Sequence, residues 1–308
     1  MLSRLVAGAL LLFACATASA GLPTFCDRPD KVTATDQDRV LRFAAAVKDE
    51  LARSDSSVAL VARAGLDLHR FGLLYSHAGI ALKGNPGGPW AVRQLYYACD
   101  ESRPLLFDQG MSGFVLGADA PTHGLVALLF PPAEDGALLE RAALDKPLAL
   151  SLLGDRYSAN AYAFGIRYQN CNQWVAELLA FAWGGLDGAA PTSHASLTSH
   201  ARTQAQAWLR ARDYAAAPVR VPSHLLMFAG QFVPFVHVND HPLDDVYALA
   251  LHVSVPTVLE DFVHREAPQT RRVELCHDER RIVVHRGWEA LGADCTPLPG
   301  DEVIALAP

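Results

Sequence analysis

The chain has 308 residues, of which 51% are hydrophobic and 19% are charged. This composition excludes a disordered chain, because such chains lack the apolar side chains that offset the entropy lost on folding. The formal net charge is -7, and no basic stripe is present to displace counterions from phosphates, so a nucleic-acid partner is not expected. The length fits one large domain or two modest ones.

The N-terminus has the three parts of a secretory signal peptide. Arg4 supplies the positive charge, residues 5–14 form a short apolar run, and residues 18–20 (Ala-Ser-Ala) are a small-x-small cleavage site. We therefore expect cleavage after Ala20 and export into a bacterial periplasm. A lipoprotein signal at Cys15 is the alternative, although a bulky residue close before it fits that signal poorly. No apolar run reaches the ~20 residues of a membrane-spanning helix, so we expect no transmembrane segment in the mature chain.

Export makes the pairing of the cysteines informative, because disulfides form in that compartment. Removal of Cys15 leaves five cysteines, so at least one stays unpaired within the chain. Cys276 and Cys295 flank a predicted hairpin and are natural partners. A bond between Cys26 and Cys99 would fasten the N-terminal arm. These two pairs leave Cys171 as the free thiol.

After the signal peptide (1–20) we predict an N-terminal arm and helix (21–54), a core (55–200) and a C-terminal α/β extension (201–308). The helix of the first part begins at Thr35-Asp36 and spans residues 35–52, because apolar residues recur there at helical spacing with charges between them.

The core is predicted to begin with strands at 57–62, 76–82 and 90–97. The turn signal in residues 84–89 makes the last two strands a hairpin. Further strands are predicted at 113–116 and 125–130, and helical segments at 135–143, 147–153 and 171–183. Asn170 is the expected N-cap of the last helix, and Gly184-Gly185 end it.

The extension is predicted to hold a helix at 203–212 and then an irregular Pro-rich region. Paired strands follow at 272–276 and 281–286, with a third strand at 302–306. The sequence leaves open whether these strands form a second domain or extend the sheet of the core.

Cys171 is a candidate nucleophile because it lies where a helix begins. The positive end of the helix dipole lowers the pKa of a thiol and favours the attacking thiolate. The free backbone N–H groups at that end also stabilise an oxyanion on a substrate carbonyl. The alternative is a buried structural cysteine, which behaves as a small apolar residue.

A nucleophilic thiol needs a base, and the base needs a group that orients it. His77 begins a predicted strand, and the next residues (Ala-Gly, 78–79) are small enough to let a helix or a substrate approach closely. The hairpin register places His77 opposite Gln94 or Leu95, and Gln94 is the polar one that would fix the imidazole tautomer. Cys171, His77 and Gln94 are therefore the candidate catalytic residues.

Two other sets of polar residues are explained more simply by structural roles than by catalysis or metal binding. Arg63 and Asp67 have the spacing of an ion pair beside the site. His237, Asp240 and His241 have ligand-like spacing, but nearby prolines argue against a helix that would put both imidazoles on one face, and no His-Glu-x-x-His run is present. We therefore expect no metal and no cofactor.

Together these motifs resemble the circularly permuted NlpC-type papain-like cysteine hydrolases, whose superfamily includes bacterial cell-wall amidases and the lecithin:retinol acyltransferase relatives. The resemblance lies in Tyr75-Ser-His-Ala-Gly-Ile80, in the hairpin with Val92-Arg-Gln94, and in Asn170-Cys171 at the start of a Gln-Trp-Val-Ala-Glu helix. It covers about residues 55–185, and the histidine strand precedes the cysteine helix as in the permuted members. The whole chain also resembles a family of exported proteobacterial proteins of unknown function.

The superfamily resemblance implies an α+β fold in which an antiparallel sheet packs on the cysteine-bearing helix, here with a C-terminal β-rich extension. It also implies a cysteine nucleophile, a histidine base and a polar third residue. By position these are Cys171, His77 and Gln94. Permuted members often carry His or Glu in the third place, so Gln94 departs from their pattern.

The sequence therefore favours an exported thiol hydrolase of amidase or peptidase type that acts on an amide or ester. Peptidoglycan peptide is the first expected substrate class, and an acyl lipid or lipoprotein is the second. The alternative is a non-enzymatic periplasmic binding or assembly protein that retains the fold. A hydrolase needs His77 and Cys171 within hydrogen-bond reach beside a groove, whereas a cysteine sealed beneath Trp174 or Trp183 favours the alternative. The sequence does not indicate the oligomeric state.

Overall fold

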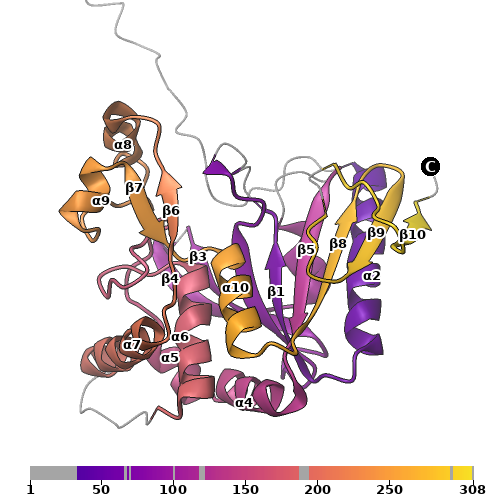
Figure 1. The fold of residues 1–308 in the computed structure, drawn as a ribbon, viewed down its shortest axis with the longest axis horizontal. Coiled ribbons are helices and arrows are strands. Elements are labelled where there is room, and N and C mark those ends of the chain that lie inside the picture. Colours follow the sequence, from indigo (N-terminus) through magenta and orange to yellow (C-terminus); the bar gives the residue numbers. More distant parts are fainter. Residues whose placement is uncertain are drawn as a thin grey trace, which may run out of the picture. The chain divides into compact units, whose positions relative to one another are not determined.

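The computed structural model describes residues 33–306 except for 66–67, 69–70, 100, 118–121, 187–193 and 292–293. In this part of the chain, eight strands form one main sheet: β1 (Val58–Arg63), β2 (His77–Leu82), β3 (Ala91–Ala98), β4 (Arg103–Gln109), β5 (Gly124–Phe130), β8 (Arg271–His277), β9 (Arg281–Arg286) and β10 (Glu302–Ala305). Their order is β10-β9-β8-β5-β1-β2-β3-β4, and all neighbours are antiparallel (Figure 1). The predicted α+β class with an antiparallel sheet is confirmed.

The C-terminal strands continue the sheet that the core strands begin. β8 pairs with β5 along its whole length, from Gly124 opposite His277 to Phe130 opposite Arg271. β9 then pairs with β8, and β10 with β9. The question that the sequence left open is thereby answered, because the core and the extension share one sheet.

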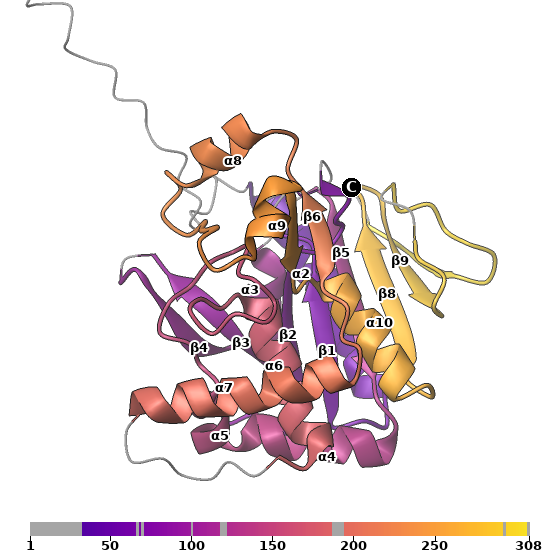
Figure 2. The same ribbon diagram turned by 60° about the vertical axis from the view of Figure 1, so that its left-hand side comes forward.

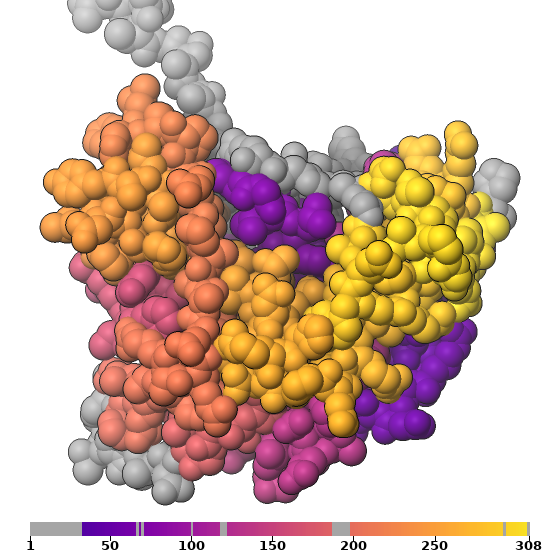
Figure 3. Space-filling model, viewed as in Figure 1, coloured from indigo at the N-terminus to yellow at the C-terminus, as the bar shows by residue number. Residues whose placement is uncertain are grey.

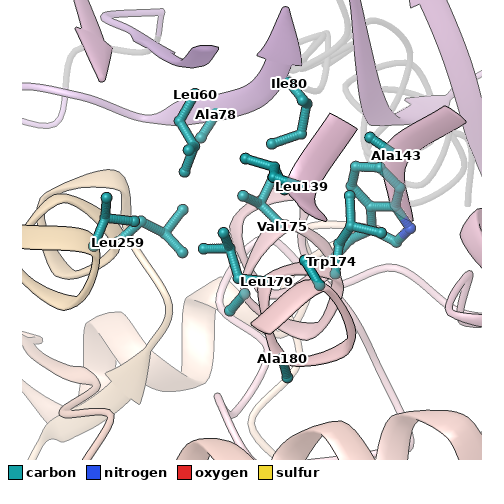
Figure 4. Close-up of a cluster of buried hydrophobic side chains, with 14 of the residues drawn as sticks. Leu60, Ala78, Ile80, Leu139, Ala143, Trp174, Val175, Leu179, Ala180 and Leu259 are labelled. Atoms are coloured by element: carbon teal, nitrogen blue, oxygen red, sulfur yellow. The ribbon is translucent and has the colours of Figure 1, made fainter. Parts of the chain in front are cut away.

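Helices cover both faces of the main sheet (Figure 2). On one face lie α4 (Ala133–Leu144), α5 (Lys146–Ser151), α6 (Cys171–Gly184), α7 (His194–Ala211) and α10 (Pro256–Glu266), and on the other lie α2 (Ala34–Arg53) and α3 (Met111–Leu116). Strand residues alternate between the two hydrophobic cores. Ala78 and Ile80 of β2 point toward Val175 and Leu179 of α6 (Figure 4), whereas Ala81 packs in the α2 and α3 core.

α2 is the predicted N-terminal helix. Its N-cap is Thr33, whose hydroxyl accepts a hydrogen bond from the Asp36 amide at 3.1 Å. The predicted start at Thr35 lies one residue after the observed first helical residue, Ala34. Val40, Phe43, Val47 and Leu51 are buried on the side that faces the sheet, as the helical spacing predicted.

The prediction of a strand at residues 113–116 was wrong, since these residues belong to α3. A run of four apolar residues has too little periodicity to separate a strand from a helix. β4 was not predicted; it is an edge strand and pairs with β3 from Val92 opposite Gln109 to Ala98 opposite Arg103. Pro104 is compatible with that strand because an edge strand has one side free of ladder hydrogen bonds.

The region predicted to be irregular and Pro-rich contains a small lobe. It consists of β6 (Ala217–Arg220), α8 (His224–Gly230), α9 (Leu243–Tyr247) and β7 (Ala250–Val253), with β6 and β7 paired. In the space-filling view the lobe lies in orange at one side of the visible face, and the C-terminal strands lie in yellow at the other (Figure 3). The lobe is joined to the segment that precedes α6, because the Ala159 amide donates to the Phe235 carbonyl at 2.8 Å.

The disulfide between Cys276 and Cys295 is present, as predicted, and joins β8 to the segment after β9. Cys99 is disulfide-bonded. Its predicted partner Cys26 lies outside the described residues, as does the expected signal peptide. Cys171 is the free cysteine of the described part of the chain.

No helix in the described ranges combines the length and the apolar character that crossing a membrane requires.

Candidate active site

Helix α6 places Cys171 at its first position. The Asn170 side chain accepts a hydrogen bond from the Gln173 amide at 2.7 Å, which confirms the predicted N-cap. The Asn170 side-chain nitrogen also donates to the Ser254 carbonyl at 3.1 Å. Gly185 ends the helix in the left-handed conformation, with φ 58°, which a glycine adopts without a steric penalty. Local signals at both ends therefore fix where the helix begins and ends.

A buried ion pair fastens α6 to α7. The Arg202 Nε lies 2.9 Å from a Glu177 carboxylate oxygen, and both side chains are at most 1% exposed. Gln169 and Gln206 donate to the same carboxylate at 2.6 Å and 2.8 Å. The Arg202 guanidinium also donates to the Gly165, Ile166 and Tyr168 carbonyls, which lie in the segment that leads to Cys171. This network fixes the backbone of the segment that precedes Cys171. It was not predicted from the sequence.

The sulfur of Cys171 lies against the backbone of β2. The Ala78 amide donates a hydrogen bond to it, and the amides of Asn172 and of Cys171 itself also contact it. β2 pairs with β3 only from Ile80 to Leu82, so the Ala78 amide takes no part in that ladder. The thiol therefore lies beside the part of β2 that is not paired with β3. The amide that contacts it belongs to Ala78, the residue after His77.

Tyr157 is a residue of this site that the sequence analysis missed. Its hydroxyl is hydrogen-bonded to Cys171, and its ring stacks on Tyr97 with 5.0 Å between the centroids. Tyr97 in turn contacts Phe235 of the lobe, at 5.7 Å between centroids. Cys171 is only 4% exposed. No local pattern marks Tyr157, because it meets the thiol through the tertiary structure.

His77 and Gln94 are brought together across β2 and β3. The His77 Nε2 is hydrogen-bonded to the Gln94 Oε1, and the Gln94 Nε2 donates to the Gln109 Oε1 at 2.7 Å. Gly79 allows this approach, since a Cβ there would lie 3.2 Å from the Cβ of Gln94. Of the two residues that the predicted register offered, Gln94 rather than Leu95 meets His77, because Leu95 packs in the α6 core.

The structure does not join His77 to Cys171 directly. The His77 ring lies 5.8 Å from the Phe114 ring of α3, whereas Cys171 packs in the core on the α6 face. Within the described residues, the hydrogen bond of His77 is the one to Gln94. The Cys171 thiol of α6 thus lies against the Ala78 amide of β2, whereas the imidazole of His77, the residue before Ala78, lies on the α3 side of the sheet.

Burial sets the charge of both groups. It raises the pKa of the Cys171 thiol to about 11, although the surrounding backbone amides act in the opposite direction. Burial, together with the nearby Arg63 guanidinium, lowers the pKa of His77 to about 3. At neutral pH the resting site therefore holds a neutral thiol and a neutral imidazole. The expected lowering of the thiol pKa by the helix dipole is outweighed by desolvation.

Arg63 lies beside His77 on the α3 side of the sheet. The two residues are opposite each other in the β1–β2 register. The Arg63 guanidinium lies 5.3 Å from the centre of the Phe114 ring and donates to the Gly117 carbonyl. Its predicted partner Asp67 lies outside the described residues. The positive charge favours a neutral imidazole and an ionised thiol at the same time.

The histidines with ligand-like spacing make structural contacts. The His241 Nε2 is hydrogen-bonded to the Asn160 carbonyl at 2.7 Å, and the Asp240 carboxylate accepts from the Tyr162 amide at 2.9 Å. The His237 ring stacks on Tyr168 at 4.4 Å. In the part of the chain that the structure describes, no group of three or more His, Cys, Asp or Glu side chains is arranged to hold a metal ion.

The fold and the site define an α+β protein with a buried thiol at a helix start beside a hydrogen-bonded His–Gln pair. The chain belongs to a family described as "uncharacterized protein conserved in bacteria (DUF2145)", whose model matches residues 50–263. This confirms the predicted membership of a bacterial family of unknown function. Neither the curated proteins nor the solved structures gave a significant match.

Proposed function

We propose that this protein is an exported cysteine hydrolase with a permuted papain-like core, which cleaves an amide or ester through a thioester on Cys171. The observation that carries the proposal is the position of the Cys171 sulfur. It lies at the start of α6 and accepts a hydrogen bond from the amide that follows His77, whose Nε2 is bonded to Gln94. Cys171, His77 and Gln94 thus lie near one end of β2, which supports the proposed roles of nucleophile, base and orienting group.

The hydrogen bond that the His77 Nε2 donates to the Gln94 Oε1 leaves Nδ1 as the working atom of the base. With Nε2 engaged by Gln94, Nδ1 of His77 accepts the thiol proton while the sulfur attacks the carbonyl carbon. The imidazolium then protonates the leaving amine or alkoxide, which leaves an acyl group on the sulfur. Water attacks this thioester after giving a proton to His77, and the acid and the thiol are released. The amides of Ala78 and Asn172, which contact the sulfur, are suited to stabilise the oxyanion.

Because the Cys171 thiol and the His77 imidazole are both neutral in the resting protein, the proposed reaction starts only when a substrate enters the site. The thiol is covered by Tyr157, and its pKa is raised because it is desolvated. A substrate carbonyl that displaces the Tyr157 hydroxyl would bring a polar group to the sulfur and give His77 access to the thiol proton. The occupied protein would therefore react readily, whereas the empty protein would react only slowly with thiol reagents such as iodoacetamide.

The substrate class follows from the compartment and the resemblance. The N-terminal sequence has the three parts expected of a signal peptide, and the Cys276–Cys295 disulfide fits an oxidising compartment. Peptidoglycan peptides are the amide substrates that a periplasmic hydrolase of this resemblance would meet. Acyl lipids or lipoproteins are the next class, with an ester or amide as the cleaved bond. The proposed reaction uses no cofactor.

The test is hydrolysis of purified peptidoglycan, with the soluble products identified by mass spectrometry. We expect Cys171→Ala to abolish product formation and His77→Gln to lower the rate by about 10²–10⁴-fold. His224→Gln, an exposed change on α8, serves as the matched control. An acyl adduct on Cys171 in rapidly quenched wild-type samples would identify the intermediate. Equal products from wild type and Cys171→Ala, with both peptidoglycan and acyl-ester substrates, would refute the proposal.

Two observations favour a second function: Cys171 is 4% exposed, and His77 and Cys171 are not hydrogen-bonded to each other in the described structure. These features suit a non-enzymatic periplasmic binding or assembly protein in which Cys171 is a core residue. On this reading, Cys171→Ala leaves every cellular phenotype unchanged and alters only the free energy of unfolding.

A further inference from the structure

A second glutamine continues the hydrogen-bonded chain that begins at His77. The Gln94 amide is 1% exposed and uses both of its ends, the Oε1 toward His77 and the Nε2 toward the Oε1 of Gln109 at 2.7 Å. Gln109 is the last residue of β4, which is one of the two edge strands of the main sheet. It reaches His77 only through Gln94. We call this set the His77–Gln94–Gln109 chain.

The direction of this chain decides which nitrogen of His77 carries the proton. An amide side chain has an accepting oxygen and a donating NH₂ group, so it presents opposite characters to its two neighbours. Because Gln109 accepts from Gln94, the Gln94 oxygen faces His77, and a neutral His77 must donate from Nε2. Nδ1 is then unprotonated. Reversal of the chain would present the Gln94 NH₂ group to Nε2 and move the ring proton to Nδ1.

The surroundings hold Gln109 in place from the other side. A Cβ at Gly113 of α3 would lie 3.0 Å from the Gln109 Nε2, so the backbone of α3 borders the amide closely. The backbone of Gln109 is also fixed, because Gln109 lies opposite Val92 in the β3–β4 register and directly precedes Gly110, the N-cap of α3. The end of the edge strand and the start of α3 therefore determine where the acceptor for Gln94 lies.

We propose that Gln109 is a positioning residue, which acts through Gln94 to keep the proton of neutral His77 on Nε2 and leave Nδ1 free to accept a proton. The inference rests on the proposed function for its catalytic meaning, since a base is needed only if Cys171 reacts. The hydrogen-bond chain itself does not depend on any reaction. Its effect on the tautomer is therefore measurable in the resting protein.

The experiment uses two substitutions of similar length and opposite hydrogen-bonding character. Gln109→Glu only accepts, so it keeps the observed direction, whereas Gln109→Lys only donates and reverses it. The tautomer is read from long-range ¹H–¹⁵N correlations of the histidine rings near pH 7, where His77 is neutral, with His77→Gln to assign the signals. Gln231→Lys adds the same charge at an exposed position and is the matched control.

We expect Nε2–H in the wild type, in Gln109→Glu and in Gln231→Lys, and Nδ1–H in Gln109→Lys. Hydrolysis by Gln109→Lys should fall about 10²-fold or more, with the activity of Gln109→Glu preserved. If Gln109→Lys fails to fold, Gln109→Leu frees the Gln94 amide to rotate and should give a mixture of the two tautomers.

Retention of Nε2–H in Gln109→Lys, or of a single Nε2–H form in Gln109→Leu, would overturn the positioning role whatever happens to the activity. The other outcome is that the His77 tautomer changes with the residue at position 109 but the protein hydrolyses none of the substrates. That result would support the positioning role of Gln109 and contradict the proposed hydrolase function. The two failures are thus distinguishable.

Discussion

The hydroxyl of Tyr157 is hydrogen-bonded to the sulfur of Cys171, and the Tyr157 ring stacks on Tyr97. This contact covers the thiol, whereas the local sequence predicts only that the thiol lies at the start of a helix. It also stabilises the charge that would develop on sulfur, because a hydroxyl donor favours the thiolate. Tyr157 therefore both shields the thiol and tunes it, and removing its hydroxyl separates the two effects.

Tyr157→Phe keeps the ring stack and deletes the donor. A hydrogen bond to a charged group contributes about 1.5–3 kcal/mol, so the pKa of Cys171 should rise by about one to two units. Alkylation of Cys171 by iodoacetamide, followed by mass spectrometry at a fixed pH below that pKa, should slow about tenfold for each unit. Tyr97→Phe removes a hydroxyl from the same stack and should change the rate little. Equal or faster alkylation of Tyr157→Phe would contradict the donor role.

Gly79→Ala tests the close approach of β3 to β2. The added Cβ would lie 2.6 Å from the Val92 Cγ1 and 3.0 Å from the Arg93 carbonyl oxygen, so the backbone of β3 must move. We expect a loss of about 1–3 kcal/mol in the free energy of unfolding, measured in urea. Gly84→Ala is the control because its nearest neighbouring atom would lie 3.8 Å away. If both variants unfold at the same urea concentration, the strands are not tightly packed at this point.

Glu177→Gln tests the buried ion pair behind α6. The substitution leaves the charge of Arg202 buried without a carboxylate, and breaking such a pair costs about 3–5 kcal/mol of stability. Asp38→Asn breaks the exposed Arg42–Asp38 pair and should cost about 1 kcal/mol or less. Chemical denaturation of both variants measures the difference. Similar small losses would mean that Arg202 finds enough compensation in the carbonyls around it.

The stability of the protein should depend on pH through His277. Burial, opposed by a hydrogen bond to the Asp278 carbonyl, lowers the pKa of His277 to about 4, whereas the unfolded chain binds this proton near pH 6.5. Between these values the unfolded state holds more protons, so stability falls as the pH falls from 6.5 to 4, by about 3 kcal/mol at most. His77 acts in the same direction, with a pKa of about 3.

His277→Gln should remove one proton from this dependence, which is measured as the slope of the unfolding free energy against pH. The comparison of slopes separates titration from the packing that the His277 ring makes with Phe43 at 4.5 Å. His224→Gln, exposed on α8, should leave the slope unchanged. An unaltered slope in His277→Gln would show that His277 is protonated equally in both states.

Local signals in the sequence determined the elements whose ends are chemically marked. Helix α6 begins at Cys171 because Asn170 caps it and ends where Gly185 adopts a left-handed conformation. The β2–β3 hairpin followed from its turn residues, and the Cys276–Cys295 bond from the hairpin between them. In each case the residues that carry the signal lie within a few positions of the feature, or flank one hairpin.

Contacts distant in sequence decided the rest. α3 and β4 escaped prediction because short apolar runs take their form from their neighbours in space. The same holds for the Glu177–Arg202 pair and for Tyr157 on the thiol. The sequence alone pointed to Cys171, His77 and Gln94, but the charge of the thiol depends on desolvation, which only the packed structure sets. That packing reverses the expected shift, because burial raises the thiol pKa by more than the amides at the helix start lower it.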